Sequence, residues 1–162
     1  MEKLFSRGLA TLLIGMMGMM LSGSQDRGGN AGIQDQFVGA WRLAALDEPG
    51  PDGKIHRADS IGLLVFTHDG HMSVQVMFRN PPAESSVTNP APVQYSQGGY
   101  EASFGTYKID ESAHTFTFHV DGAVVRSLVG KDLPRSFKFS GKQLIVKSAR
   151  PDEHWKVVWE HY

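Results

Sequence analysis

The strongest constraint on the fold is an alternation of apolar and polar residues that runs from Phe37 to the C-terminus. Apolar side chains recur at every second position over short stretches, and Gly, Asp, Ser and Pro separate these stretches. A period of two is typical of a β strand with one buried face, and no window of about eleven residues carries the spacing of an amphipathic helix. The sequence therefore predicts an all-β chain.

The clearest predicted hairpin is centred on Asp69-Gly70, with an apolar stretch on each side. Asp-Gly tolerates the positive φ angles of a two-residue type I′ turn. Such a turn places His68 opposite His71, and counting outward by twos defines one apolar face that we expect to be the interior. The residues of this face are Leu63, Val65, Thr67, Met72, Val74, Val76 and Phe78.

The same count predicts two further hairpins, with turns at 110–113 and 141–142. The first aligns Gly105, Tyr107 and Ile109 with Phe116, Phe118 and Val120, and the second aligns Arg135, Phe137 and Phe139 with Leu144, Val146 and Ser148. Segments 37–45 and 155–161 supply the first and last strands, and 124–129 is a candidate for one more. About eight strands in meander order favour a closed up-and-down antiparallel barrel, because closure leaves no unpaired edge. A barrel of this size can enclose one small ligand.

The N-terminus has the pattern of a signal peptide. Lys3 and Arg7 precede an uncharged apolar run of 13 residues, 9–21, and the small residues Ser22 and Ser24 follow it. The run is shorter than the roughly 20 residues that span a bilayer. We predict a signal peptide at 1–24, a flexible leader at 25–34, a barrel domain at 35–162 and export to a periplasm or the medium, with no membrane span after cleavage. An uncleaved N-terminal anchor is the alternative.

Composition and motifs exclude several functions. The chain has no Cys and a formal net charge of -1, which rules out thiol chemistry and argues against a nucleic-acid partner. It carries no Gly-x-Ser-x-Gly, His-Glu-x-x-His or phosphate-binding Gly loop, so we expect no cofactor. His68 and His71 could share a metal ion across their turn, but two nitrogens without a third ligand make a poor site. We therefore expect no metal.

The connection at 79–99 is far longer than a hairpin loop, which usually has about two to five residues. It contains four Pro and shows no periodicity. Two interpretations follow: a lid across an open end of the barrel, or a disordered insertion.

Gly39-x-Trp41, in the first predicted strand, resembles the first-strand signature of lipocalins. The order and spacing of four later segments are similar to the bacterial and fungal lipocalin-like domain family, over nearly all of 37–162. These segments are GLLVFTHDGHMSVQ at 62–75, FGTYKID at 104–110, HVDG at 119–122 and VWE at 158–160. The resemblance implies a β-barrel with an enclosed cavity but no particular reaction. It also implies that a late-strand Arg, here Arg135, packs on the first-strand Trp41 and closes the barrel bottom.

Polar residues on the predicted inner face mark a candidate site. Glu101, Ser103 and Tyr107 share the inward parity of Gly105, and Arg135 shares that of the phenylalanines after it. A buried Arg or Glu is unfavourable unless paired. These groups therefore pair with each other, lie at a wet mouth, or meet a polar group on a ligand.

Three functions remain, and the sequence favours the first. The first is an exported protein that binds one small apolar molecule, with the site residues Trp41, Met72, Ser103, Tyr107, Phe118, Arg135, Phe137, Trp155 and Trp159. The second is a barrel enzyme, an isomerase, cyclase or hydratase of an apolar substrate, in which Glu101 or Tyr107 acts as acid or base. The third is a filled structural barrel without a ligand.

Overall fold

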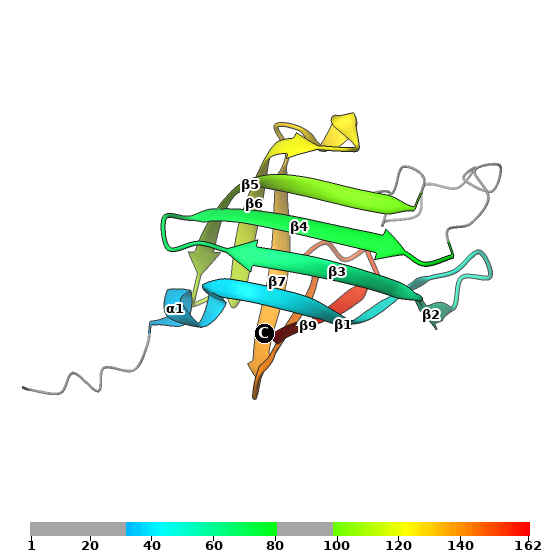
Figure 1. Cartoon of the computed structure of the whole chain (residues 1–162), viewed down its shortest axis with the longest axis horizontal. Helices are drawn as coiled ribbons and strands as arrows, with labels where there is room; N and C mark the ends of the chain where they lie inside the picture. Colours follow the sequence, from blue (N-terminus) through cyan, green and yellow to red (C-terminus); the bar gives the residue numbers. More distant parts are fainter. Residues whose placement is uncertain (1–31, 81–98) are drawn as a thin grey trace, which may run out of the picture.

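The computed structural model describes residues 32–80 and 99–162. Within them the chain forms one short α helix, one 3-10 turn and nine strands (Figure 1). The elements are α1 (Ile33–Phe37), β1 (Gly39–Pro49), β2 (Ile55–Arg57), β3 (Ser60–Phe66), β4 (His71–Phe78), β5 (Tyr100–Asp110), β6 (Thr115–Ala123), η2 (Arg126–Leu128), β7 (Asp132–Ser140), β8 (Gln143–Ser148) and β9 (Lys156–His161). The predicted signal peptide, most of the leader and nearly all of the predicted lid lie outside the described residues.

The strands form a closed antiparallel barrel. From β3 to β9 each strand pairs with the next along the chain, and β1 pairs with both β3 and β9. Eight strands therefore make the wall, while the short β2 extends the sheet only at the far end of β1, where Asp47 lies opposite Arg57. This architecture confirms the predicted all-β up-and-down barrel. Closure satisfies the backbone groups along the edges that an open sheet would leave unpaired.

Two predicted hairpins have the predicted register. Tyr107 lies opposite Phe118 between β5 and β6, and Phe137 lies opposite Val146 between β7 and β8. All four side chains are buried. In both hairpins the alternation of apolar and polar residues and the length of the turn predict the same register, so the sequence alone identifies the inward face.

The predicted register of the hairpin between β3 and β4 is wrong. Its loop has three residues, His68, Asp69 and Gly70, because the Thr67 amide donates to the His71 carbonyl at 2.9 Å. Gly70 has a φ of +86°, as in a hairpin loop that ends in a glycine bulge. The Thr67 hydroxyl also donates to the Asp69 carboxylate, which holds this longer loop.

The extra loop residue reverses the two faces of β3. Leu64 and Phe66 are buried, whereas Leu63 and Val65, which we expected inside, lie on the outer side of the strand. The inner face of β4 is as predicted, with Met72 and Val76 buried. A shift of one residue in the pairing moves every side chain of a strand to the opposite face. Here β3 has the opposite face to the predicted one, and β4 keeps the predicted face.

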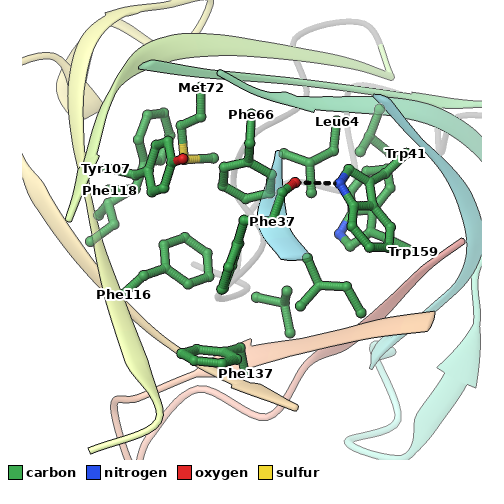
Figure 2. Close-up of a cluster of buried hydrophobic side chains, with 14 of the residues drawn as sticks. Phe37, Trp41, Leu64, Phe66, Met72, Tyr107, Phe116, Phe118, Phe137 and Trp159 are labelled. Atoms are coloured by element: carbon green, nitrogen blue, oxygen red, sulfur yellow. Dashed lines mark hydrogen bonds between the residues drawn. The ribbon is translucent and has the colours of Figure 1, made fainter. Parts of the chain in front are cut away.

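We predicted that Phe37 begins the first strand, but it ends α1 and closes one end of the barrel. Its side chain is fully buried, and its ring lies 4.8 Å from Phe137 and 5.1 Å from Phe66 between centroids. The Trp41 indole Nε1 donates to the Phe37 carbonyl at 2.8 Å, which ties β1 to the end of the helix (Figure 2). The start of α1 at Ile33 overlaps the last two residues of the predicted leader.

Two smaller differences concern the other end of the chain. Segment 124–129, a candidate strand, contains the 3-10 turn η2 instead, and β9 begins one residue later than predicted, at Lys156. In the described part of the chain no helix has the length and apolar character needed to cross a membrane.

We expect Phe37→Ala to destabilise the fold by about 3–5 kcal/mol, because it empties the centre of a buried aromatic cluster. Phe104→Ala is the matched control, since Phe104 is 59% exposed on the outer face of β5 and its loss should change stability by about 1 kcal/mol or less. Urea unfolding followed by circular dichroism measures both. Equal losses in the two variants would contradict the role of Phe37 as a plug.

Candidate ligand cavity

The barrel holds a cavity of about 90 Å³. It lies away from α1, toward the end where β4 stops at Phe78 and β5 begins, and η2 contributes Leu128 to its wall. All but three of the lining residues are apolar. The lining residues are Leu46, Leu64, Met72, Val74, Val76, Phe78, Glu101, Ser103, Phe116, Phe118, Leu128, Leu133, Arg135, Val146, Trp155, Val157 and Trp159.

Most of the predicted site residues come together in this cavity. Met72, Ser103, Phe118, Arg135, Trp155 and Trp159 all line it, and so does Glu101 from the alternative catalytic pair. Except for Trp155, which directly precedes β9, these residues come from strands far apart in the sequence. The strand residues meet because alternate positions of every strand point into one closed interior.

Trp41, Tyr107 and Phe137 were predicted in the same site but belong to the packed core beside α1 (Figure 2). The Tyr107 hydroxyl donates to the Thr67 carbonyl at 2.9 Å, and its ring contacts Phe66 at 4.9 Å. Tyr107 therefore holds the hairpin between β3 and β4 and is remote from Glu101, its predicted alternative as acid or base. Parity gives the face on which a side chain lies but not its height along the barrel.

Arg135 does not pack on Trp41, contrary to what the resemblance implied. Its guanidinium lies over the Trp155 ring, 4.9 Å from the centroid. The neighbour of Trp41 is His161, whose ring is 4.7 Å away. Trp41 and Arg135 therefore take separate partners, one at the plugged end of the barrel and the other at the cavity.

Glu153 is the site residue that sequence reasoning missed. Its carboxylate oxygen Oε2 lies 4.0 Å from Arg135 Nη1, and both side chains are nearly buried, at 12% and 9% exposure. It also accepts hydrogen bonds from the Trp155 indole and from Arg150. Glu153 lies in the connection between β8 and β9, where no alternation of apolar and polar residues indicates which side chains face inward. The one sequence feature that could have pointed to it is its closeness to Trp155.

Burial and charge act differently on the two carboxyl groups. Burial raises the pKa of Glu101 from 4.5 to about 8, and the nearby charge of Arg135 only partly opposes this. Burial also disfavours the charged form of Glu153, but hydrogen bonds from Ser148 and Trp155, together with the charge of Arg135, hold its pKa below the usual value. At neutral pH the site therefore contains a protonated Glu101 beside an ionised pair of Arg135 and Glu153.

The remaining histidines that the sequence drew attention to lie outside the cavity. His68 and His71 are exposed, and the nearest carboxylates are those of Asp35 at 3.8 Å and Asp69 at 3.1 Å, respectively. Across residues 32–80 and 99–162 no three His, Asp or Glu side chains gather in a way that could hold a metal ion.

We expect Glu101→Gln to stabilise the protein in a pH-dependent way. Between pH 4.5 and about 8 the unfolded chain releases the Glu101 proton while the folded chain keeps it, so wild-type stability falls relative to the variant across this window. The two melting temperatures should be similar below the window, separate through it and keep a constant gap above it.

Thermal unfolding from about pH 4 to about pH 9.5 measures this gap. Glu111→Gln is the matched control, because Glu111 is exposed in the turn after β5 and its loss should leave the melting curves together. A gap for Glu101→Gln that is the same at every pH would contradict the assignment.

A comparison with models of known protein families agrees with this barrel. A model of the lipocalin-like domain matches residues 38–160. The chain is similar in structure to a lipocalin-like protein from Bacteroides uniformis, at 13% identity and a TM-score of 0.47, and to an uncharacterized protein from Bacteroides eggerthii, at 16% identity and a TM-score of 0.45. Each likeness covers 78% of this chain and 99% of the other. No curated protein matches the chain. Because the domain match covers most of the chain, the chain belongs to the lipocalin-like domain family.

Proposed function

We propose that this protein binds a small, largely apolar molecule inside its barrel. A lipocalin-like barrel is compatible with small-molecule binding, and the cavity is the observation that carries the proposal. Its wall is apolar except for a few polar groups, a combination that is typical of ligand sites because the apolar wall supplies affinity and the polar groups supply orientation.

The size of the cavity limits the ligand. Sites for drug-sized molecules enclose roughly 300–1,000 Å³, and an apolar cavity of about 150 Å³ is known to bind benzene. A volume of about 90 Å³ is smaller than either, and the cavity is not fully enclosed. It therefore suits one end of a slim molecule such as an alkyl chain, with the rest of the chain extending from the cavity. A filled structural barrel is less consistent with the described interior, because the aromatic packing around Phe37 leaves this separate space toward the ends of β4 and β8.

A barrel enzyme is the second candidate, and the protonated Glu101 carboxyl favours it. A carboxyl group with a pKa of about 8 can act as a general acid at neutral pH. The hydroxyl of Tyr107, the alternative acid or base, donates a hydrogen bond to the Thr67 carbonyl instead. Glu101 therefore has Ser103 and Arg135 as its polar neighbours in the cavity wall. Recovery of an unchanged ligand after prolonged incubation distinguishes binding from catalysis.

Filling the cavity tests binding. Val76 lines the cavity from β4, and Val76→Phe should weaken binding of 1-octanol at least about tenfold because the new ring occupies its space. The fluorescence of Trp155 and Trp159, which also line the cavity, reports the titration. Overpacking costs about 1–3 kcal/mol, so circular dichroism must confirm that the variant is folded.

Gln75→Phe is the control for this variant, because Gln75 is the neighbouring residue on the exposed outer side of β4. It should bind 1-octanol like the wild type. Equal affinity in Val76→Phe and Gln75→Phe, or no saturable binding to the wild type, would contradict the proposal.

We also propose that the protein is exported, from the charged N-terminus, the apolar run at 9–21 and the small residues that follow. N-terminal sequencing of periplasmic or secreted material should begin at Gln25 or within a few residues of it. A chain recovered from the cytoplasm with Met1 still in place would contradict export.

A further inference from the structure

The polar part of the cavity wall indicates which kind of ligand end the site accepts. It consists of Glu101 and Ser103, two residues apart on the inner face of β5, and Arg135 on β7. Two of these residues are ionisable, so their charge states decide whether an anion, a cation or a neutral group is the better partner.

The charge of Arg135 is already balanced by the protein. Glu153 lies 4.0 Å from its guanidinium, the Pro134 carbonyl accepts a hydrogen bond from Nη1 at 3.1 Å, and the Trp155 ring stacks against it. An additional anion beside Arg135 would have to share this cation with Glu153 in a nearly buried setting. Bringing a second carboxylate there is unfavourable, because each buried charge loses its hydration and like charges repel.

Glu101 has no such partner in the described part of the chain. Its carboxyl makes no hydrogen bond to the described residues, and Arg135 is the one charged group there that acts on it. Its cross-strand neighbour is Val76 on β4, and the inner face of that strand continues with Val74 and Phe78. Across the other edge, β6 ends at Ala123, opposite Ser103.

This setting favours the protonated form of Glu101. Ionisation would place a charge against apolar walls with a guanidinium that Glu153 already neutralises. Glu101 lines the cavity with its side chain only partly buried. A protonated carboxyl has one O–H to donate, so an oxygen of a ligand in the cavity can accept this hydrogen bond in place of water.

We propose that the ligand presents an uncharged oxygen, a hydroxyl or a carbonyl, to the Glu101 carboxyl, and that the site discriminates against a carboxylate or an ammonium group on the same chain. The inference rests on the proposed binding function and goes beyond it by naming the ligand class. A ligand carboxylate would compete with Glu153 for the one cation, Arg135, and a ligand ammonium group would lie near that same cation.

Three probes with the same chain length test this selectivity: 1-octanol, octanoate and octylamine. Isothermal titration calorimetry at about pH 6.5, where octanoate and octylamine are both charged, should give an affinity for 1-octanol at least about tenfold above either charged probe. Tighter binding of octanoate or octylamine would overturn the inference and leave the binding function standing. Binding of none of the three would contradict the binding function itself.

Variants separate a hydrogen bond to Glu101 from a simple preference for neutral molecules. Glu101→Leu replaces the carboxyl with an apolar side chain of similar size and should weaken 1-octanol binding about fivefold, the usual effect of one lost hydrogen bond. If apolar contact alone governs selectivity, the same variant should bind 1-octanol as tightly as the wild type or more tightly, and the inference fails.

The pH dependence of 1-octanol binding is a second test, because a purely structural role of Glu101 would not change it. Raising the pH to about 9.5 ionises Glu101 but leaves 1-octanol neutral, so wild-type affinity should fall between about pH 6.5 and about pH 9.5. Glu101→Gln has an amide donor that does not titrate, and its affinity should stay constant over the same range. Parallel pH profiles for the two proteins would overturn the inference.

Discussion

The pairing of β1 with both β3 and β9 is the constraint on which the rest of the structure depends. It turns a nine-stranded meander into a closed wall, so alternate residues of eight strands share one interior that water reaches poorly. In such an interior an apolar side chain is stabilised by burial, whereas an ionised one needs a partner. The arrangement of the aromatic plug, the cavity and the paired charges follows from this division.

The interior has two parts with different packing. Beside α1, the rings around Phe37 interlock in edge-on contacts such as that with Phe137, which are favourable for aromatic pairs. Toward the ends of β4 and β8, valines such as Val76 and Val146 line open space together with larger rings such as those of Trp155 and Trp159. The first part stabilises the barrel, and the second leaves the cavity in which we propose that the ligand binds.

Much of the fold could be predicted because the alternation and the turns agree. The hairpins β5–β6 and β7–β8 came out in register since each has one plausible turn. The predicted register of the β3–β4 hairpin was wrong because Asp69-Gly70 suits both a two-residue turn and a three-residue loop. The hydrogen bond from the Thr67 hydroxyl to Asp69 stabilises the three-residue loop. The prediction that Phe37 begins a strand was wrong because its position depends on contacts with five aromatic residues distant in sequence and not on the local pattern.

Sequence reasoning placed several of the cavity-lining residues on the inner face of the barrel, but it did not give the contacts between them. Inward parity correctly selected Glu101, Ser103 and Arg135 as residues of the interior wall. It could not show that Glu153, in an irregular connection, balances Arg135, because that contact joins segments with no common periodicity. It also could not separate the two ends of the barrel, which is why Tyr107 was grouped with the cavity.

The most direct test of the central claim is to locate a bound probe by NMR. With methyl-labelled protein, the chain protons of 1-octanol should give intermolecular nuclear Overhauser effects to the methyl groups of Val76 and Leu133, which line the cavity. The methyl groups of Leu63 and Val65, on the outer side of β3, should give none. Contacts to Leu63 and Val65 without contacts to Val76 and Leu133 would contradict the account, because the probe would then lie on the barrel surface.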